Sequence, residues 1–405
     1  MPADHDSSQV VIAGAGVAGV ATARALRANG FQGRVILASA ESTMPYDRPP
    51  LSKQLLSGSM GTSDLVTLST DQASELAIEV HLADPAKDLD VDGRRLRLAS
   101  GRELPFDHLV VATGSRPRRL PEVLPDVVAS DRVHYLRDLS DAVAFRGALS
   151  ELRSLVVLGG GFIGLEVACA ARERGIDVLV VEAGPRLLGR VLDPLAAGLV
   201  QEMHQAHGVR MRLATQVDRI IQVDSRLEVG LSDGTTLVTD SLMVGIGAVP
   251  NVEWLGDAVA VDQGVVCSAD GMTSVDGIYA VGDVSRWFGS WMPSGERIEQ
   301  WQAALEHGEV VGRNIAQPGQ RSHWRSVPYF WSDQYGRKIQ LCGRVGERSQ
   351  LFRTAQGPVV LYGDGTRLCG VMAVHQPRVV ALARRLLAQA APWSEAAAWA
   401  GSLAA

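Results

Sequence analysis

Two stretches of the chain share one pattern of apolar and polar positions. In each, a short apolar run enters a glycine-rich turn, a helical segment follows, and a second apolar run ends near a glutamate. The runs span residues 10–13 and, after Arg34, residues 35–38 in the first stretch, and 155–158 and 178–181 in the second. Uninterrupted apolar runs of this length are typical of strands buried in a parallel sheet. The pattern predicts two strand–turn–helix–strand units.

The two turns have the sequences GAGVAG at 14–19 and GGGFIG at 159–164, which match a dinucleotide-binding fingerprint. The first glycine permits a tight bend, the second lets the backbone approach a pyrophosphate, and the third allows helix and strand to pack closely. The start of the helix adds free N–H groups and a partial positive charge. Glu182, at the end of the second unit, would hold a ribose. Two copies of the fingerprint indicate two bound nucleotides.

The remaining pattern predicts how the chain continues. An apolar strand over 108–117 breaks at Thr113 and Gly114, and a strand over 242–251 ends in a similar glycine–proline break, which is typical of a crossover between domains. A hairpin turn is expected at 100–101, and a buried strand ends at Gly282 and Asp283. The sequence after it predicts a helix over 297–315, short strands at 339–341 and 359–362, and a closing helix over 378–389.

Composition limits the class of protein. The chain has 405 residues, of which 46% are hydrophobic and 21% charged, as in globular proteins of two or three domains. No apolar segment approaches the roughly 20 residues of a membrane span, and the first residues lack a basic region followed by an apolar run. We therefore expect a cytoplasmic protein.

The cysteines and histidines do not suggest a metal or dithiol site. Cys169, Cys267, Cys342 and Cys369 are far apart and form no Cys-x-x-Cys pair, so we expect them to be buried small hydrophobic residues. The histidines show no metal-binding signature, and we expect no metal. His204 and His207 are spaced to share a helix face, and that pair is expected to be solvated rather than to bind an ion.

Charge is unevenly distributed along the chain. The net charge is −6, but residues 325–405 carry ten Lys and Arg against four Asp and Glu, a net charge of +6. A basic region of this kind could steer an acidic protein partner, or it could be a solvated surface without a role. No basic helix or aromatic-interleaved stripe accompanies it, which argues against nucleic acid as the partner.

A proline-rich loop at 44–53 follows the first unit, and Asp47, Arg48 and Lys53 crowd into it. The prolines make the loop rigid, and its position just after the first nucleotide unit favours a role in lining the cofactor.

These features together resemble the NADH-dependent ferredoxin reductases of the putidaredoxin reductase-like family, FAD flavoproteins with two dinucleotide-binding domains. The resemblance covers nearly the whole chain. It rests on the motifs PYDRPPLSK at 45–53, ATGSRP at 112–117, GGGFIGLE at 159–166, GIG at 245–247 with PN at 250–251, AVGD at 280–283 and FWSDQY at 330–335.

The resemblance implies an α/β fold with two Rossmann-like domains and a C-terminal α+β interface domain. FAD would bind a discontinuous domain of residues 1–115 and 245–324, NADH would bind residues 116–244, and residues 325–405 would form the interface domain. Relatives in this family usually carry Gly-Asp or Gly-Glu before the next acidic residue, whereas this chain has Ser39-Ala40-Glu41, and we expect Glu41 to bind the adenosine ribose of FAD. Tyr329 stands where many relatives have Trp.

The matching motifs also imply the cofactor contacts, with Asp283 on the ribityl–pyrophosphate portion of FAD. The expected cofactor-binding residues are Gly14, Ala15, Gly16, Gly19, Glu41, Arg48, Pro49, Lys53, Ala86, Thr113, Gly114, Arg137, Gly159, Gly161, Phe162, Ile163, Gly164, Glu182, Gly247, Gly282, Asp283, Trp301 and Trp331.

The implied reaction is hydride transfer from nicotinamide C4 to flavin N5, followed by two single-electron transfers to a [2Fe–2S] ferredoxin that serves a haem monooxygenase or dioxygenase. The protein then has to hold the nicotinamide against the flavin and tune the flavin's electronics. Lys53 and Glu166 are the expected catalytic residues, because a cation near N5 would stabilise the reduced flavin and a carboxylate could hold that cation. The alternative is that both are ordinary surface charges.

Charge also predicts the nucleotide and the partner. A carboxylate at Glu182 would bind the ribose hydroxyls of NADH and repel the 2′-phosphate of NADPH, although Arg186 lies four residues further on. The partner is expected to be an acidic [2Fe–2S] ferredoxin that docks near the basic C-terminal domain, including Arg337, Lys338 and Arg344, on a monomer or weak dimer.

Other functions of this fold need other features. A dithiol reductase needs paired cysteines near the flavin, and a peroxide- or oxygen-reducing relative usually carries one redox cysteine in the loop that here spans 47–53; neither is present. Reduction of rubredoxin, quinone or oxygen, and a role as a flavin-bound redox sensor, stay open as alternatives.

Overall fold

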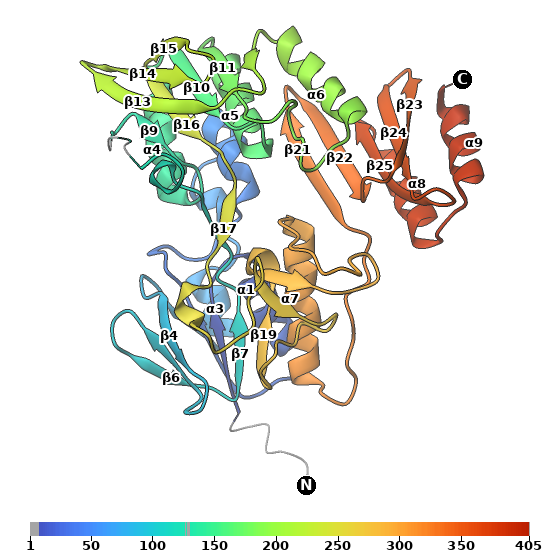
Figure 1. The fold of residues 1–405 in the computed structure, drawn as a ribbon. Coiled ribbons are helices and arrows are strands. Elements are labelled where there is room, and N and C mark those ends of the chain that lie inside the picture. Colours follow the sequence, from blue (N-terminus) through green and yellow to red (C-terminus); the bar gives the residue numbers. More distant parts are fainter. Residues whose placement is uncertain (1–7, 126, 128–129, 405) are drawn as a thin grey trace. The chain divides into compact units, whose positions relative to one another are not determined.

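The computed structural model describes residues 8–125, 127 and 130–404 (Figure 1). The chain forms two compact units, each built from segments that are distant in the sequence. Unit 1 comprises Met1–Asp47, Ser63–Arg116 and Val249–Pro328, and unit 2 comprises Arg48–Thr62, Pro117–Ala248 and Tyr329–Ala405. The border between the units falls inside the proline-rich loop: its residues 44–47 belong to unit 1, and its residues 48–53, which include Lys53, belong to unit 2.

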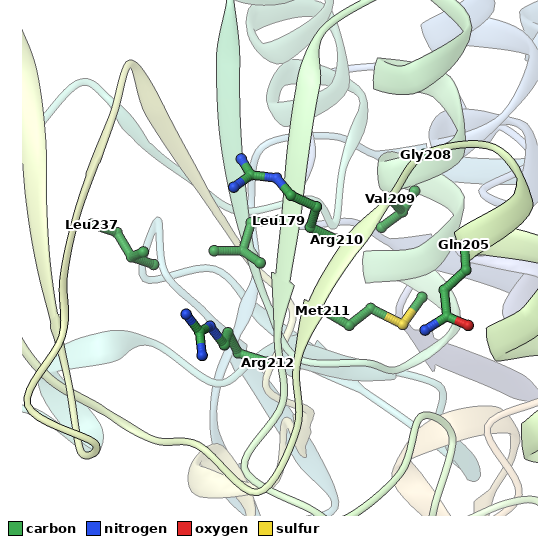
Figure 2. A pocket seen from close by; sticks show the side chains of 8 residues that line it. All are labelled: Leu179, Gln205, Gly208, Val209, Arg210, Met211, Arg212 and Leu237. Atoms are coloured by element: carbon green, nitrogen blue, oxygen red, sulfur yellow. The ribbon is translucent and has the colours of Figure 1, made fainter.

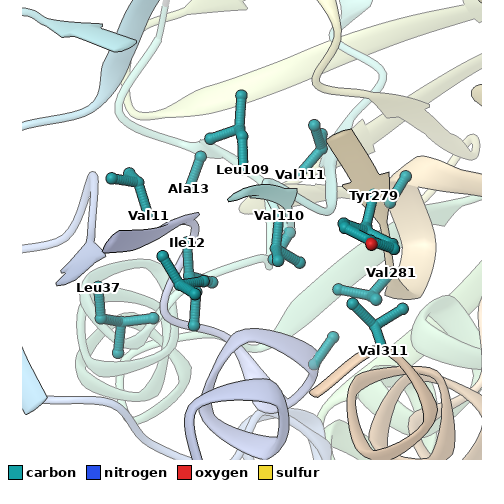
Figure 3. Close-up of a cluster of buried hydrophobic side chains, with 14 of the residues drawn as sticks. Val11, Ile12, Ala13, Leu37, Leu109, Val110, Val111, Tyr279, Val281 and Val311 are labelled. Carbon is teal, nitrogen blue, oxygen red and sulfur yellow. The ribbon is translucent and has the colours of Figure 1, made fainter. Parts of the chain in front are cut away.

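A five-stranded parallel sheet forms the centre of unit 1. Its strands lie in the order β19 (Ile278–Ala280), β7 (His108–Val111), β1 (Gln9–Ala13), β2 (Arg34–Ala38) and β3 (Ile78–His81). The middle strands are almost wholly apolar because both faces of the sheet are covered. Figure 3 shows Ile12 and Val110 in this core together with Tyr279 and Val311.

Two helices of unit 1, α1 (Val17–Ala28) and α7 (Trp301–Ala316), pack closely against each other, and glycines allow that approach. A Cβ atom at Gly308 would lie 2.4 Å from the carbonyl oxygen of Ala18, and one at Gly312 would lie 2.6 Å from the Cβ of Ala25. Atoms do not approach so closely, so the backbones can touch only because these side chains are missing.

The remaining elements of unit 1 are short. They are the helix α3 (Thr70–Glu75), an antiparallel sheet of β4 (Ala86–Asp90), β5 (Arg95–Leu98) and β6 (Glu103–Pro105), the parallel pair β18 (Val265–Cys267) and β20 (Ser285–Trp287), and the 3-10 turns η2 (Ser63–Leu65), η4 (Glu253–Leu255) and η5 (Gly282–Val284). The expected turn at 100–101 joins β5 to β6. Two strands, β8 (Ser115–Pro117) and β17 (Ala248–Pro250), lie at the sequence borders of the units.

Unit 2 repeats the parallel architecture. Its first sheet has the order β12 (Arg210–Arg212), β11 (Asp177–Val181), β10 (Ser154–Leu158), β16 (Ser241–Val244) and β9 (Val133–His134), and all its pairs are parallel. It is accompanied by the helices α4 (Leu139–Leu149), α5 (Phe162–Glu173) and α6 (Pro194–Ala206), the 3-10 turn η3 (Leu120–Glu122), and an antiparallel meander of β13 (Val217–Val223), β14 (Arg226–Leu231) and β15 (Thr236–Thr239). The proline-rich loop adds the 3-10 turn η1 (Pro49–Ser52) and the short helix α2 (Gln54–Ser57).

The C-terminal part of unit 2 is a second, antiparallel sheet with two helices. The strand order is β21 (Tyr329–Gln334), β22 (Arg337–Gly343), β25 (Leu368–Val374), β24 (Gly357–Gly363) and β23 (Arg348–Thr354), followed in the chain by α8 (Pro377–Ala388) and α9 (Trp393–Ala404). The expected architecture, two dinucleotide-binding folds and a C-terminal α+β part, is confirmed.

Some predicted boundaries are wrong. The helix expected from residue 297 begins at Trp301, because Gln300 has extended backbone angles (φ −129°, ψ 132°). The helix expected at 378–389 is α8 and fits within one residue, but α9 follows it and is missing from the sequence-based prediction. Within the described residues, no helix combines the length and apolar character needed to cross a membrane.

The α1–α7 contact gives a stability test. Gly308→Ala should destabilise the protein by about 1–3 kcal/mol, because the added methyl group has no space, and chemical unfolding measures the change. Gly198→Ala is the matched control: it also lies inside a helix, but a Cβ there meets nothing within 4 Å. The control should be stabilising by up to about 1 kcal/mol through helix propensity. A Gly308→Ala variant as stable as Gly198→Ala would contradict the packing argument.

Candidate functional site

The first glycine turn of unit 1 has the geometry that the fingerprint requires. Gly14 has a φ of +118°, and a Cβ there would lie 2.1 Å from the carbonyl oxygen of Ala112. A Cβ at Gly19 would lie 2.0 Å from the carbonyl oxygen of Gly14. The helix can therefore pack against the turn only if residue 19 is a glycine. At Gly16 a Cβ would face open space, and this is the position where the backbone can approach a ligand.

The second turn, in unit 2, repeats this geometry residue by residue. Gly159 has a φ of +98°, and its Cβ would lie 2.2 Å from the carbonyl oxygen of Gly245. A Cβ at Gly164 would lie 2.4 Å from the carbonyl oxygen of Gly159, whereas the nearest atom to one at Gly161 is 4.0 Å away. Both turns thus leave an open side at their second fingerprint glycine.

The helices that follow these turns start without a cap from any described side chain. Gly16 and Gly161 are the N-caps of α1 and α5, and the first turns of both helices lack acidic residues. By contrast, the side chains of Ser69, Asp138 and Asp193 cap α3, α4 and α6. Uncapped N–H groups and the helix dipole favour an anion at this end of a helix. The residues present therefore fit the pyrophosphates of two dinucleotides.

The two acidic residues after the second strands both accept hydrogen bonds. Glu182 accepts from the backbone N–H groups of Gly160 and Gly184, each at 2.6 Å, so its carboxylate is held beside the second glycine turn. Glu41 accepts from the hydroxyl of Tyr46. Each carboxylate oxygen can accept more than one hydrogen bond, so both carboxylates can still accept from a ribose.

Asp283 lies beside the start of α1. It follows Gly282, whose φ is +71° and whose Cβ would lie 3.0 Å from the Cβ of Ala18. The hydroxyl of Ser115 is 3.5 Å from the Oδ2 atom of Asp283.

Thr113 and Gly114 lie in a tight loop held by a residue far along the chain. The Thr113 hydroxyl donates to the carbonyl oxygen of Asn251 at 2.8 Å, the Asn251 amide donates to the carbonyl of Thr113 at 2.9 Å, and the Asn251 backbone N–H donates to the carbonyl of Gly114 at 2.9 Å. The two strand breaks in the sequence thus join each other in unit 1.

Other predicted residues of unit 1 have specific partners. The indole N–H of Trp301 donates to Asp47 at 2.6 Å. Ala15 and Ala86 pack at the edge of the core of unit 1.

In unit 2, Lys53 and Glu166 come together from the loop and from α5. The Lys53 ammonium lies 2.8 Å from the Oε2 atom of Glu166, and the exposed fractions of the two side chains are 10% and 5%. The ammonium also donates to the carbonyl of Pro49 at 3.2 Å. The hydroxyl of Ser52 donates to Oε2 of Glu166, and the hydroxyl of Ser332, on β21, donates to Oε1. Glu166 is buried and the Lys53 side chain is only 10% exposed, so the alternative that both are ordinary surface charges is wrong.

Two further predicted cofactor-binding residues of unit 2 are neighbours of this pair: Arg48 lies in the same loop as Lys53, and Phe162 lies on the same helix as Glu166. The Arg48 guanidinium donates to the carbonyl of Arg137 at 2.7 Å, which ties the loop to the chain before α4. The Phe162 ring, at the start of α5, meets the ring of Phe330 edge-on with 4.6 Å between centroids, and the neighbouring Ile163 is 43% exposed.

Trp331 and Gly247 have basic neighbours. The Trp331 ring stacks with Tyr329 at 6.0 Å between centroids, and the Lys338 ammonium lies 5.5 Å from the centre of the Trp331 ring. Gly247 has a φ of +112°, and its Cβ would lie 3.4 Å from the guanidinium of Arg190.

The histidine prediction is wrong for one of its two residues. His204 is buried rather than solvated: its ring nitrogens contact Gln334 at 2.7 Å and the hydroxyl of Tyr335 at 2.9 Å. Burial lowers its pKa to about 4. His207 is exposed, and its ring stacks on Tyr335.

All four cysteines are buried and unpaired, as the sequence predicts. Burial raises the pKa of the Cys169 thiol to about 12 and that of Cys369 to about 11, so these thiols are poor nucleophiles at neutral pH.

A cavity of about 590 Å³ opens at the edge of the parallel sheet of unit 2, beside β12 (Figure 2). Its lining combines guanidinium groups with apolar side chains, and none of the predicted site residues belongs to it. The lining residues are Leu179, Gln205, Gly208, Val209, Arg210, Met211, Arg212 and Leu237.

Several residues of the site were not singled out by the sequence. Ser52 and Ser332 bind the Glu166 carboxylate, and Asn251 closes the loop at Thr113. Each lies inside or beside a motif of the resemblance, so the signal was present. Only the three-dimensional contacts show which polar residue of a motif faces the site.

Comparison with known proteins identifies the family. The family of pyridine nucleotide-disulphide oxidoreductases matches residues 8–308, and the reductase C-terminal family matches residues 329–403. Rhodocoxin reductase of Rhodococcus erythropolis is 36% identical over 95% of this chain and 90% of its own length. The ferredoxin–NAD(+) reductase component of the p-cumate 2,3-dioxygenase system of Pseudomonas putida is 35% identical over 95% of this chain and 94% of its own length.

Two more comparisons concern the electron acceptor and the fold. The rubredoxin–NAD(+) reductase of Ectopseudomonas oleovorans is 34% identical over 92% of this chain and 94% of its own length. Among solved structures, the ferredoxin reductase for the CYP199A2 system of Rhodopseudomonas palustris superposes with a TM-score of 0.90 at 32% identity, over 95% of this chain and 96% of that one. The chain belongs to the pyridine nucleotide-disulphide oxidoreductase family with a reductase-type C-terminal domain, and it is an oxidoreductase whose cofactors are FAD and NADH.

Proposed function

We propose that this chain is an NADH-dependent ferredoxin reductase, which passes electrons from NADH through FAD to a [2Fe–2S] ferredoxin that supplies a haem monooxygenase or a dioxygenase. The names of its relatives support this, since they include a reductase component of a dioxygenase system. The observation that carries the proposal is the buried Lys53–Glu166 pair beside the start of a nucleotide-binding helix, together with four cysteines that are buried and unpaired.

When bound, FAD and NADH would supply the redox chemistry, namely hydride transfer from the nicotinamide and release of electrons one at a time. The protein then has to place charges and exclude water. Glu166 fixes the Lys53 ammonium in a dry position, where a cation stabilises negative charge more strongly than it would in water. Ser52 and Ser332 hold both oxygens of Glu166, so the ammonium has one defined place.

The cofactors would be divided between the two glycine turns. Residues 1–115 and 245–324 would bind FAD through the turn at 14–19, and residues 116–244 would bind NADH through the turn at 159–164. In this assignment Glu41 binds the adenosine ribose of FAD and Glu182 that of NADH. Residues 325–405 would form the interface domain against the flavin.

The acceptor would dock on the basic C-terminal region. Arg337 and Arg344 are exposed there, whereas the charge of Lys338 is partly compensated by Asp333 at 2.8 Å. Trp331 lies under Lys338 and would face the flavin edge. An acidic ferredoxin would be steered by this charge.

A second acceptor has direct support. A relative of nearly equal identity is a rubredoxin reductase, so rubredoxin is the main alternative to a [2Fe–2S] ferredoxin. The two proposed functions, ferredoxin reductase and rubredoxin reductase, share the reduction of FAD by NADH and differ only in the protein that accepts the electrons.

The first test concerns Lys53. Lys53→Met should slow the reduction of bound FAD by NADH by about tenfold or more, because a loss of about 1.4 kcal/mol of charge stabilisation has that effect. Stopped-flow absorbance of the flavin measures the rate. Lys87→Met, at an exposed lysine of β4, is the matched control and should react like the wild type.

Loss of Lys53 also leaves Glu166 as a buried carboxylate without its cation, which could harm the fold rather than the chemistry. The double variant Lys53→Met/Glu166→Gln removes both charges and should restore thermal stability without restoring the rate. A wild-type rate in Lys53→Met with full flavin content would refute the role of the ammonium.

The second test concerns the nucleotide. NADH should be preferred over NADPH by about tenfold to a hundredfold in kcat/KM, because Glu182 repels a 2′-phosphate. Glu182→Gln should narrow that ratio, whereas Glu202→Gln, at an exposed glutamate of α6, should leave it unchanged. Equal kcat/KM for the two nucleotides in the wild type would contradict the assignment.

The third test concerns the acceptor. NADH-driven cytochrome c reduction should rise strongly when a [2Fe–2S] ferredoxin is added, and the KM for that ferredoxin should increase with salt as screening weakens the attraction. The double variant Arg337→Ala/Arg344→Ala should raise the KM at low salt, while Arg97→Ala, on β5 of unit 1, should not. A rise with rubredoxin but not with ferredoxin would favour the alternative, and a KM independent of salt would remove the electrostatic argument.

A further inference from the structure

Glu166 is the end of a continuous line of polar side chains in unit 2, all of them buried except the half-buried Tyr335 at the other end. Beyond Ser332, the amide nitrogen of Gln334 donates to the Ser332 hydroxyl at 2.9 Å, the amide oxygen of Gln334 is 2.7 Å from Nε2 of His204, and Nδ1 of His204 is 2.9 Å from the hydroxyl of Tyr335. Ser332 and His204 have no exposed surface, and Gln334 is 1% exposed. We call these four residues, Ser332, Gln334, His204 and Tyr335, the polar line.

The polar line joins parts of the sequence that are far apart. Ser332 and Gln334 are two residues apart on β21, so both point to the same face of the strand. That face meets α5, which carries Glu166, and α6, which carries His204. Apolar side chains would suffice to pack a strand on two helices. A buried amide and a buried imidazole, by contrast, are costly unless they have hydrogen-bond partners, so packing alone does not explain them.

The direction of every hydrogen bond follows from the one at Glu166. A carboxylate only accepts, so Ser332 gives its single proton to Glu166 and accepts from the Gln334 amide nitrogen. The Gln334 oxygen therefore faces His204, and Nε2 of His204 must carry a proton.

His204 is neutral at ordinary pH, because burial lowers its pKa to about 4. With the proton on Nε2, Nδ1 is an acceptor and takes the hydroxyl proton of Tyr335. Every bond thus donates toward Glu166. Aligned hydrogen bonds polarise one another, so a donor several bonds away strengthens the last bond of the line.

The outer end of the line is anchored as well. The Tyr335 ring stacks on His207 with 3.7 Å between ring centroids, and the backbone N–H of Tyr335 donates to the sulfur of Cys169 at 3.1 Å. These contacts hold the ring where its hydroxyl reaches His204.

We propose that the polar line is a positioning network, in which Ser332, Gln334, His204 and Tyr335 fix the orientation of the Glu166 carboxylate and through it the place of the Lys53 ammonium. The network does not conduct protons, since an amide at Gln334 interrupts it and passes no proton without changing its own bonding. This inference rests on the proposed role of the Lys53–Glu166 pair in flavin reduction.

The first experiment reads the network without any turnover. In the holoenzyme labelled with ¹⁵N-histidine, two-bond ¹H–¹⁵N correlations should show His204 as the neutral tautomer with the proton on Nε2, unchanged between pH 6 and 8. A proton on Nδ1, or a charged ring in this range, would overturn the assigned directions and with them the proposal.

The second experiment uses the rate of FAD reduction by NADH and the midpoint potential of the bound flavin. Ser332→Ala should slow the reduction about fivefold, since a neutral-donor hydrogen bond to a charged group is lost, and should shift the potential in the same direction as Glu166→Gln. Tyr335→Phe keeps the ring and removes only the first donor, so it should have a smaller effect, about twofold. Because both act through one line, the double variant should be no slower than Ser332→Ala.

Tyr362→Phe is the matched control. It removes a buried hydroxyl from β24 of the same sheet, where the hydroxyl donates to Asp193 at 2.9 Å outside the polar line. Its rate and potential should equal those of the wild type. Thermal melting and flavin content separate a fold defect from a positioning effect, and the histidine tautomer can be measured even where a variant binds FAD weakly.

The outcomes separate this inference from the proposed function. If Glu166→Gln alters the rate and potential but Ser332→Ala and Tyr335→Phe do not, or if their effects multiply in the double variant, the network is overturned and the role of the ion pair stands. If Glu166→Gln and Lys53→Met also leave both unchanged, the proposed role of the pair fails as well.

Discussion

The buried carboxylate of Glu166 is the constraint on which unit 2 depends. A carboxylate removed from water is costly in free energy unless each of its oxygens has a hydrogen-bond donor or a cation beside it. Here the partners are Ser52 in the loop before α2, Ser332 on β21, and the Lys53 ammonium. Residues 52, 53, 166 and 332 must therefore fold together before the carboxylate is satisfied. A buried ion pair contributes little stability compared with apolar packing of the same volume, so its place is better explained by chemistry than by folding.

The two glycine turns show how one backbone solution is built twice from different residues. In unit 1 the carbonyl of Ala112, the first residue after β7, closes against Gly14. In unit 2 the carbonyl of Gly245, the first residue after β16, closes against Gly159. Each contact leaves no space for a side chain, and each places a neighbouring strand end beside the start of a helix. The strand breaks that follow Ala112 and Gly245 are therefore equivalent parts of the two nucleotide folds.

The sequence predicts features whose cause is local and misses those whose cause lies elsewhere in the chain. The fingerprint glycines were predictable because the bend, the close approach and the helix contact each concern a few adjacent residues. His204 was mispredicted because helix spacing shows which residues share a face but not what covers it, and the strand that covers it lies about 130 residues later. The Lys53–Glu166 pair was predictable only through the resemblance, since 113 residues separate the partners in the chain.

The buried cysteines bear on how electrons leave the protein. In reductases that use a dithiol, the electrons pass to sulfur before they reach a substrate, which requires an accessible thiolate. Here all four thiols are buried, and burial raises the pKa of Cys342 to about 12, so none is suited to that step. Under the proposed function, electrons on the flavin would pass directly to an external acceptor that comes close to it. The proposed docking on the basic C-terminal sheet, which carries Trp331 on its edge strand, would meet this requirement, because a charged surface can bring an acidic electron carrier near an aromatic side chain without covalent chemistry.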